Sequence, residues 1–221
     1  MTAFITRSLS PDSEFCRLLT AQGWQVTGHS LVVLSALPFA SLPEADWIFF
    51  SSKNAVQFFF QQVEKEHIII AGVRWAALGT ATAEMLKKYV GAVDFTGSGE
   101  PNHTAAVFRP LVMGSTIIFP AARHSRQSVQ HALAAAVQGI HLEVYDNCPV
   151  TDPALRTESV LVFTSPLNAE AYLARHSLWP GQRVVAIGQT TAAALRSLGI
   201  EAVGVAIEPT EAALAQAVLA L

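Results

Sequence analysis

The sequence predicts an α/β fold in which a small, doubly wound parallel-sheet unit occurs twice. The chain has 221 residues, of which 51% are hydrophobic and 14% are charged, enough for one large domain or two small ones. Short apolar and β-branched runs alternate with helical patterns, which is typical of a parallel sheet covered on both faces. The third observation is that segments of the first half resemble segments of the second half.

Four pairs of similar segments follow one another in the same order along the chain. They are residues 4–7 with 120–123, 46–52 with 159–165, 75–82 with 184–191, and 104–107 with 210–213. Each pair is weak alone. Their shared order, at a spacing of about 110 residues, indicates two diverged copies of one unit.

Each copy is predicted to contain five strands with helices between them. The strands are expected at residues 3–6, 25–34, 47–51, 74–78 and 92–95, and at 116–119, 141–145, 160–164, 183–187 and 202–206. The helices are expected at residues 12–21, 55–65, 81–89, 126–136, 168–175, 192–198 and 211–219. For the first helix we expect Ser10 as the cap, Pro11 at the first helical position and Gly23 at the end. Residues 38–43 and 148–153 are expected to form equivalent crossings between the halves.

Composition and motifs exclude several classes of protein. The net charge of −3 argues against a general nucleic-acid surface, and no apolar run approaches the ~18 residues of a membrane span. The N-terminus lacks the pattern of a secretory signal, so we expect a cytoplasmic protein. No glycine fingerprint for a dinucleotide and no P-loop occurs, and we expect no cofactor.

Metal and nucleophile motifs are also missing from the sequence. Cys16 and Cys148 lack metal spacing, and no His-Glu-x-x-His or close Cys/His cluster occurs, so we expect no metal. Most of the seven histidines are expected at the surface. No Gly-x-Ser-x-Gly turn and no pair of carboxylates at a catalytic spacing is present. The chain offers weak polar donors and no strong nucleophile.

The candidate binding residues follow the predicted strands, where ligands of open α/β sheets bind. Helices begin at these points, and their N-termini present unpaired N–H groups and a partial positive charge that bind anions. The candidates are Arg7, Ser52, Lys53, Asn54, Gly79, Thr80, Thr82, Arg123, Thr164, Ser165, Gly188, Thr190 and Thr191. The alternative is structural: the hydroxyls are ordinary helix caps, the glycines permit close packing, and Lys53 and Arg126 are solvated charges.

Tyr145 is the candidate catalytic residue. It ends the apolar run at residues 140–144 and precedes the crossing into the last part of the chain. Its phenol could donate a hydrogen bond or a proton into a cleft. The alternative is an amphipathic aromatic side chain that seals a hinge.

Several short segments together resemble the uroporphyrinogen-III synthase family. They are Ile-Thr-Arg at 5–7, Ser-Ser-Lys-Asn-Ala-Val at 51–56, Leu-Gly-Thr-Ala-Thr-Ala at 78–83, Phe-Thr-Ser-Pro at 163–166 and Ala-Ile-Gly-Gln-Thr-Thr-Ala at 186–192. Gln189 stands where the family usually has proline, so the resemblance does not predict the conformation of that turn.

The resemblance implies two flavodoxin-like, doubly wound domains joined by a two-stranded hinge. Residues 1–34 and 152–221 would form one domain, residues 38–147 the other, and residues 35–37 and 148–151 the linkers. The resemblance is compatible with a monomer that has a small-molecule substrate and no nucleic-acid or membrane partner.

The resemblance also implies a reaction in tetrapyrrole (heme) biosynthesis. The family is a cyclising lyase that converts hydroxymethylbilane into uroporphyrinogen III, with loss of water, a spiro intermediate and inversion of the last pyrrole ring. The substrate would bind in the cleft between the domains, where Tyr145 would assist loss of the hydroxyl group and Thr191 would face the substrate. A non-catalytic two-domain binder or sensor of a small anionic metabolite is the alternative.

Overall fold

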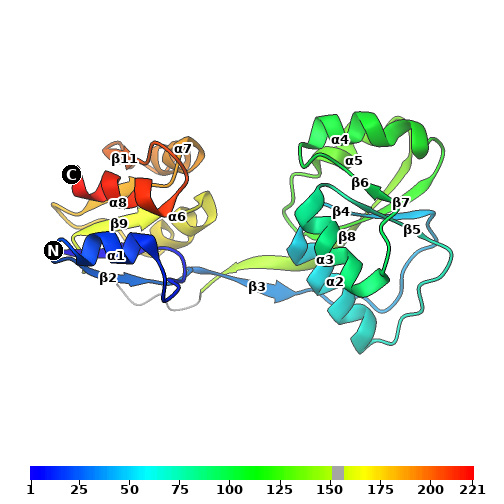
Figure 1. The fold of residues 1–221 in the computed structure, drawn as a ribbon, viewed down its shortest axis with the longest axis horizontal. Coiled ribbons are helices and arrows are strands. Elements are labelled where there is room, and N and C mark those ends of the chain that lie inside the picture. The colour runs from blue at the N-terminus through cyan, green and yellow to red at the C-terminus, as the bar shows by residue number, and fades with distance from the viewer. Residues whose placement is uncertain (151–156) are drawn as a thin grey trace. The chain divides into compact units, whose positions relative to one another are not determined.

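A computed structural model describes residues 1–150 and 157–221 of the chain (Figure 1). The chain divides into two compact units. Unit 1 contains Met1–Val33 and Cys148–Leu221, and unit 2 contains Leu34–Asn147. Residues 152 and 153, where the sequence predicts a domain boundary and the end of a crossing, lie outside the described residues.

Unit 1 is built on a five-stranded parallel sheet. Its strands are β1 (Thr2–Ile5), β2 (Gln25–Gly28), β9 (Val160–Phe163), β10 (Arg183–Ala186) and β11 (Val203–Val205), in the order β11-β10-β9-β1-β2. The strand β2, which follows β1 in the chain, lies on the outer side of β1, whereas β10 and β11, which follow β9, lie on the opposite side of the sheet. The carboxyl ends of β1 and β9 therefore flank the point where an open α/β sheet binds its ligand.

The two faces of this sheet are covered by different helix pairs. The helices α1 (Glu14–Thr20) and α8 (Glu211–Leu219) pack together, as do α6 (Pro166–Leu173) and α7 (Gln189–Ser197). Successive strand residues point to opposite faces: Ile5 belongs to the core under α1 and α8, whereas Phe4 belongs to the core under α6 and α7. Both faces are apolar, so strands such as Val160–Phe163 are buried along their whole length.

Unit 2 contains a second parallel sheet with one antiparallel edge. Its strands are β3 (Val32–Ala36), β4 (Trp47–Phe50), β5 (Arg74–Ala77), β6 (Phe95–Thr96), β7 (Thr116–Ala122) and β8 (Gln138–Pro149). Their order is β3-β8-β7-β4-β5-β6, and the neighbours from β8 to β6 are parallel. The strands β5 and β6 follow β4 on one side, and β8 follows β7 on the other, so the strand order reverses between β4 and β7. The carboxyl ends of β4 and β7 therefore flank the corresponding ligand position.

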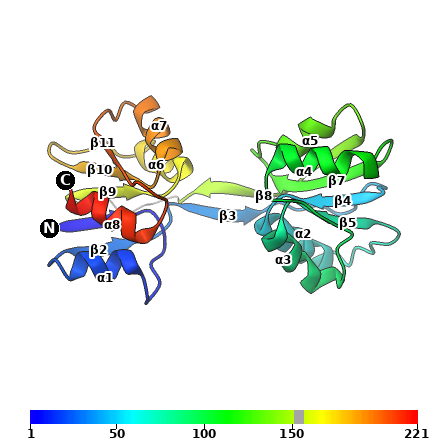
Figure 2. The ribbon, with the colours of Figure 1, turned by 45° about the horizontal axis from the view of Figure 1, so that its top comes forward.

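The helices of unit 2 also lie on both faces of its sheet, as Figure 2 shows. The helices α2 (Lys53–Lys65) and α3 (Thr80–Val90) cover one face, and α4 (Pro101–Phe108), η1 (Arg109–Leu111) and α5 (Ser128–Leu133) lie on the other. Phe50 packs in the core under α2 and α3, and its neighbour Phe49 packs in the opposite core. Burying one such side chain contributes roughly 1.5–3 kcal/mol.

The chain passes between the units through β3 and β8, which are neighbours in the sheet order. The N–H of Leu37 donates to the carbonyl of Val144 at 3.0 Å, and the N–H of Val150 donates to the carbonyl of Leu31 at 2.8 Å. Residue numbers rise along one strand as they fall along the other, so the pair is antiparallel. The expectation that residues 38–43 form a crossing is wrong, because the passage uses β3.

The structure corrects three further expectations. The predicted strand at 25–34 is two strands, because a turn held by the Ser30 hydroxyl and the backbone of Val32 separates β2 from β3. Ser10 does not cap the first helix; the cap is Ser13, whose hydroxyl accepts from the N–H of Cys16 at 3.2 Å. Helix α4 lies in a region without a predicted helix. Among the described residues, no helix has the length and apolar character needed to span a bilayer.

Candidate functional site

Two threonines join the carboxyl ends of β1 and β9 in unit 1. The N–H of Thr164 donates to the hydroxyl oxygen of Thr6 at 2.9 Å, and the hydroxyl of Thr164 donates to the carbonyl of Thr6 at 2.9 Å. Thr6 is fully buried. The hydroxyl of Thr164, a predicted binding group, is therefore engaged in holding the two strand ends together.

The hydroxyls of Ser165 and Ser52 cap helices, as the structural alternative predicts. Ser165 accepts from the N–H of Asn168 at 3.2 Å and from its side-chain amide at 2.9 Å, at the start of α6. Ser52 accepts from the N–H of Ala55 at 3.1 Å, at the start of α2. Lys53 and Asn54 follow Ser52 and are exposed. In the described parts of the chain, Lys53 forms no ion pair.

Gly188 leaves the N-terminus of α7 without a side-chain cap. It has an extended backbone, and a Cβ placed on it would meet nothing within 4 Å. A cavity of about 550 Å³ opens here, lined by residues 187–191 and 205–209. Thr191 is 3% exposed and Thr190 is exposed, and both line this cavity. The first-turn N–H groups of α7 therefore face open space.

Gly79 has the equivalent position at the start of α3, but its surroundings differ. A Cβ placed on Gly79 would lie 2.9 Å from the Cα of Gly99. The N–H of Gly99 donates to the carbonyl of Leu78 at 2.7 Å and holds that loop close. Gly79 is thus required by close packing. Thr80 is exposed beside it, and Thr82 is buried in α3.

The first predicted anion-binding arginine, Arg7, is ion-paired within unit 1. Its guanidinium contacts the carboxylate of Glu211 at the first position of α8. Burial of Glu211 favours its neutral form, but hydrogen bonds from the N–H of Phe15 at 3.0 Å and the hydroxyl of Ser13 at 2.9 Å, together with Arg7, lower its pKa. The positive charge of Arg7 is therefore balanced inside the protein.

The second predicted arginine, Arg123, is ion-paired within unit 2. Its Nε donates to Glu143 at 2.9 Å, and a terminal nitrogen donates to Asp146 at 3.1 Å. These carboxylates, with the hydrogen bond to Glu143 first, raise the pKa of Arg123. Both arginines thus lie at the carboxyl edges of their sheets with local counterions.

Tyr145 lies near the end of β8 and is 8% exposed. Its ring stacks on Phe58 of α2 with centroids 5.2 Å apart, and its carbonyl accepts from the N–H of Arg123 at 2.9 Å. Within the described part of the chain, its hydroxyl forms no hydrogen bond. The ring is therefore fixed by packing, and its hydroxyl remains available to a ligand.

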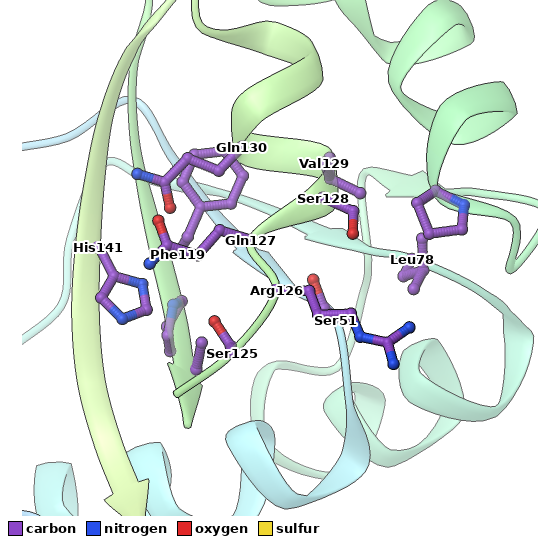
Figure 3. Close-up of a pocket in the computed structure, with 13 residues that line it drawn as sticks. Ser51, Leu78, Phe119, Ser125, Arg126, Gln127, Ser128, Val129, Gln130 and His141 are labelled. Carbon is purple, nitrogen blue, oxygen red and sulfur yellow. The ribbon is translucent and has the colours of Figure 1, made fainter. Parts of the chain in front are cut away.

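A second cavity, of about 180 Å³, lies in unit 2 at the carboxyl ends of β4, β5 and β7 (Figure 3). It is lined by Ser125, Gln130 and His141, three residues that the sequence analysis did not propose as binding residues. His141 is an exception to the expectation that most histidines lie at the surface, because both of its ring nitrogens are buried. The available signal was its position beside the apolar run at 140–144, which predicts a strand in the sheet.

Within residues 1–150 and 157–221, no group of three or more His, Cys, Asp or Glu side chains could hold a metal ion. Each unit offers hydrogen-bond donors: unit 1 has the amide N–H groups at the start of α7, and unit 2 has the exposed amine of Lys53 and the phenol of Tyr145. Such donors suit carboxylates and developing negative charge.

A family model described as uroporphyrinogen-III synthase HemD matches residues 14–216 of the chain. The structure of the Helicobacter pylori uroporphyrinogen-III synthetase is similar, with a TM-score of 0.68, 20% identity, and 100% of this chain and 99% of that chain covered. A mutant uroporphyrinogen III synthase of Thermus thermophilus gives a TM-score of 0.59 and 16% identity over 100% and 99% of the two chains. No curated protein matches the chain. The solved structures share its α/β fold with parallel sheets.

Proposed function

The chain belongs to the uroporphyrinogen-III synthase family, and on that premise we propose that it cyclises hydroxymethylbilane to uroporphyrinogen III. The family match over residues 14–216 is the observation that carries this proposal, because it includes the turns after β4, β5, β9 and β10. The enzyme is a cyclising lyase of tetrapyrrole biosynthesis. It needs no cofactor, because the reaction loses water and rearranges carbon–carbon bonds without net oxidation.

The reaction is first a problem of orientation. The hydroxymethyl group of the first ring loses its oxygen as water, and the substituted carbon of the last ring attacks the carbon left behind. The resulting spiro intermediate reopens and closes with the last ring inverted. Free substrate closes without inversion, so the protein must hold one conformation of a flexible molecule.

The substrate bears many carboxylates, and we assign their binding to the carboxyl-end turns. In unit 1 the groups are the first-turn N–H groups of α7, after Gly188, with Thr190 and Thr191 beside them. In unit 2 they are the turns that contain Ser52–Asn54 and Gly79–Thr82. The open space at Gly188 supports this assignment.

Tyr145 assists loss of the hydroxyl group as a hydrogen-bond donor or acid. Support comes from its fixed ring on Phe58 and from a hydroxyl that no group in the described part of the chain engages. A positioned donor of this kind contributes on the order of 10²-fold to a rate. Arg7 and Arg123 have the weaker role of setting the local field, because each is already ion-paired.

We further propose that both units are flavodoxin-like and that β3 and β8 form a two-stranded hinge. The strand orders support the first point, since each sheet follows the 2-1-3-4-5 pattern when unit 2 is counted from β7. The domains are residues 1–34 with 152–221, and 38–147. The protein acts as a monomer, since one chain supplies both sets of turns. It acts in the cytoplasm and has neither a nucleic-acid nor a membrane partner.

The test is to supply freshly prepared hydroxymethylbilane to the purified protein and to measure the two product isomers. The proposal predicts uroporphyrinogen III as the main product, formed faster than spontaneous closure. Formation of only the uninverted isomer, at the uncatalysed rate, would eliminate it.

A further inference from the structure

Unpartnered polar atoms gather in the small cavity of unit 2. The side-chain polar atoms that are buried and lack a hydrogen-bond partner include both ring nitrogens of His141, the hydroxyl of Ser125 and the amide oxygen of Gln130. All three residues line the same cavity of about 180 Å³. Leaving one buried polar group unsatisfied is costly, so several in one cavity indicate a missing partner.

The fold holds these groups in place. His141 is on β8, opposite Phe119 on β7, and Figure 3 shows its ring directed into the cavity on the same side as Gln130. Gln130 lies over Gly139, where an added Cβ would be 3.2 Å from its Cγ. Ser125 is in the turn after β7, where its N–H donates to the carbonyl of Ala122 at 3.0 Å. These groups come from one strand, one turn and one helix of unit 2.

The lining offers several hydrogen-bond donors to an anion. An imidazole donates through at least one ring N–H, a serine hydroxyl can donate, and the side-chain nitrogen of Gln130 donates whereas its unpartnered oxygen accepts. No aspartate or glutamate lines it, so no protein carboxylate competes for these donors. A carboxylate supplies acceptor sites on two oxygens, which matches several convergent donors.

The size of the cavity limits the ligand. An engineered cavity of about 150 Å³ holds benzene, so about 180 Å³ holds a short carboxylated chain. A whole tetrapyrrole is too large. The apolar contribution of Phe119 and Leu78 to the lining suits the methylene groups that precede a carboxylate.

We propose that this cavity is a binding pocket for one carboxylate on a short aliphatic chain, with His141, Gln130 and Ser125 as its recognition residues. That the carboxylate belongs to an acidic side chain of the tetrapyrrole substrate rests on the proposed function. The other source of the same chemistry is a free small carboxylic acid. His141 is then a specificity-determining residue that the sequence pattern did not identify.

The first arm of the test is a titration of the wild-type protein with propionate, followed by NMR of the histidine side chains. The resonance of His141 is identified by its loss in His141→Leu. Propionamide, which has the same shape without the charge, is the matched ligand control. We expect a saturable shift of the His141 resonance with propionate, with a Kd on the order of 10 mM for so small a ligand, and none with propionamide.

The second arm is kinetic and distinguishes the two sources of the carboxylate. His141→Leu and Gln130→Met should each raise the KM for hydroxymethylbilane about tenfold with little change in kcat, because they remove binding that ground state and transition state share. The matched control is His131→Leu. His131 is exposed on α5 and does not line the cavity, so its KM should stay at the wild-type value.

The results of the titration and of the kinetic measurements together distinguish a substrate subsite, a site for a free carboxylic acid and no carboxylate pocket. A propionate-specific shift with raised KM values supports a substrate subsite, and the same shift with unchanged KM values supports a site for a free carboxylic acid. No saturable shift, or equal shifts with propionate and propionamide, overturns the carboxylate pocket. A wild-type protein that makes no uroporphyrinogen III defeats the proposed function, while the titration still decides the pocket.

Discussion

Thr164 donates two hydrogen bonds to Thr6 across the carboxyl ends of β1 and β9, with both distances at 2.9 Å. Although 158 residues separate them in the chain, they fix the two strands that flank the ligand position of unit 1. The same position in unit 2 lies between β4 and β7. In unit 1 the joined strand ends lie beside β10, which leads into the start of α7, where no side chain caps the helix.

Thr6→Val tests this strand-end pair. The substitution removes the acceptor for the N–H of Thr164 at a fully buried position, so it should lower the free energy of unfolding by about 1–3 kcal/mol. Urea denaturation measures the change. Thr20→Val, at an exposed position of α1, should stay within roughly 0.5 kcal/mol of wild type. Equal costs for both variants would contradict the role given to Thr6.

Glu211 predicts a pH dependence of stability. Its pKa is lowered in the folded protein, so its contribution is present above the unfolded pKa of about 4.3 and is lost as the pH falls through the folded value. Glu211→Gln should therefore be less stable than wild type by about 1–2 kcal/mol at pH 7, with a gap that closes in acid. Chemical denaturation across this range measures the gap. A gap that does not change with pH would refute the account of this carboxylate.

The two glycine turns predict opposite responses to serine. Gly188→Ser places a hydroxyl in open space, where it can cap α7 and raise the free energy of unfolding by about a few tenths of a kcal/mol. The same hydroxyl occupies N–H groups assigned to the substrate, so KM should rise. Gly79→Ser would press against Gly99 and should cost about 1–3 kcal/mol. If Gly188→Ser leaves KM unchanged, the amides of α7 do not bind substrate.

Tyr145→Phe tests the assignment of the acid. The ring keeps its stacking on Phe58, so stability should hardly change, whereas turnover should fall by about ten- to a hundredfold. Steady-state kinetics with hydroxymethylbilane, together with thermal unfolding, separates the two effects. A variant with wild-type turnover removes the phenol from the mechanism.

Local sequence pattern predicts much of the secondary structure. The runs at 47–51 and 160–164 are β4 and β9 within one residue, and 211–219 is α8. These elements are strongly apolar or well capped, so local propensity and burial agree. Helix α4 lacks such a pattern, and its cap is Glu100. The similarity of 104–107 to the start of α8 was a usable signal for it.

The spatial grouping of the strands is not contained in the residue pattern. The repeat is in tandem, but β1 and β2 of the first copy share a sheet with β9, β10 and β11 of the second. The periodicity of hydrophobic residues indicates which face of a strand is buried, but it does not indicate which strands lie next to that strand in the sheet. Only the family resemblance implied a discontinuous domain.

The strand-end positions of the candidate residues could be predicted from the sequence, but their interactions could not. Strand-end turns are visible in sequence, but whether a hydroxyl or a charge is free depends on partners far along the chain. Ser13 and Phe15 donate hydrogen bonds to Glu211, and Glu211 forms an ion pair with Arg7. No local sequence pattern predicts these contacts. His141 was missed for the same reason, because its buried nitrogens depend on packing between β7, β8 and α5.

Amide hydrogen exchange with and without uroporphyrinogen III tests most directly whether exposed backbone donors of both units bind one polycarboxylate. The account predicts slower exchange at Gln189–Thr191 in unit 1 and at the first turns of α2 and α3 in unit 2. The start of α1, after Ser13, is not assigned to the substrate and should show no change. Exchange that is unaltered by the product in either set of turns would contradict it.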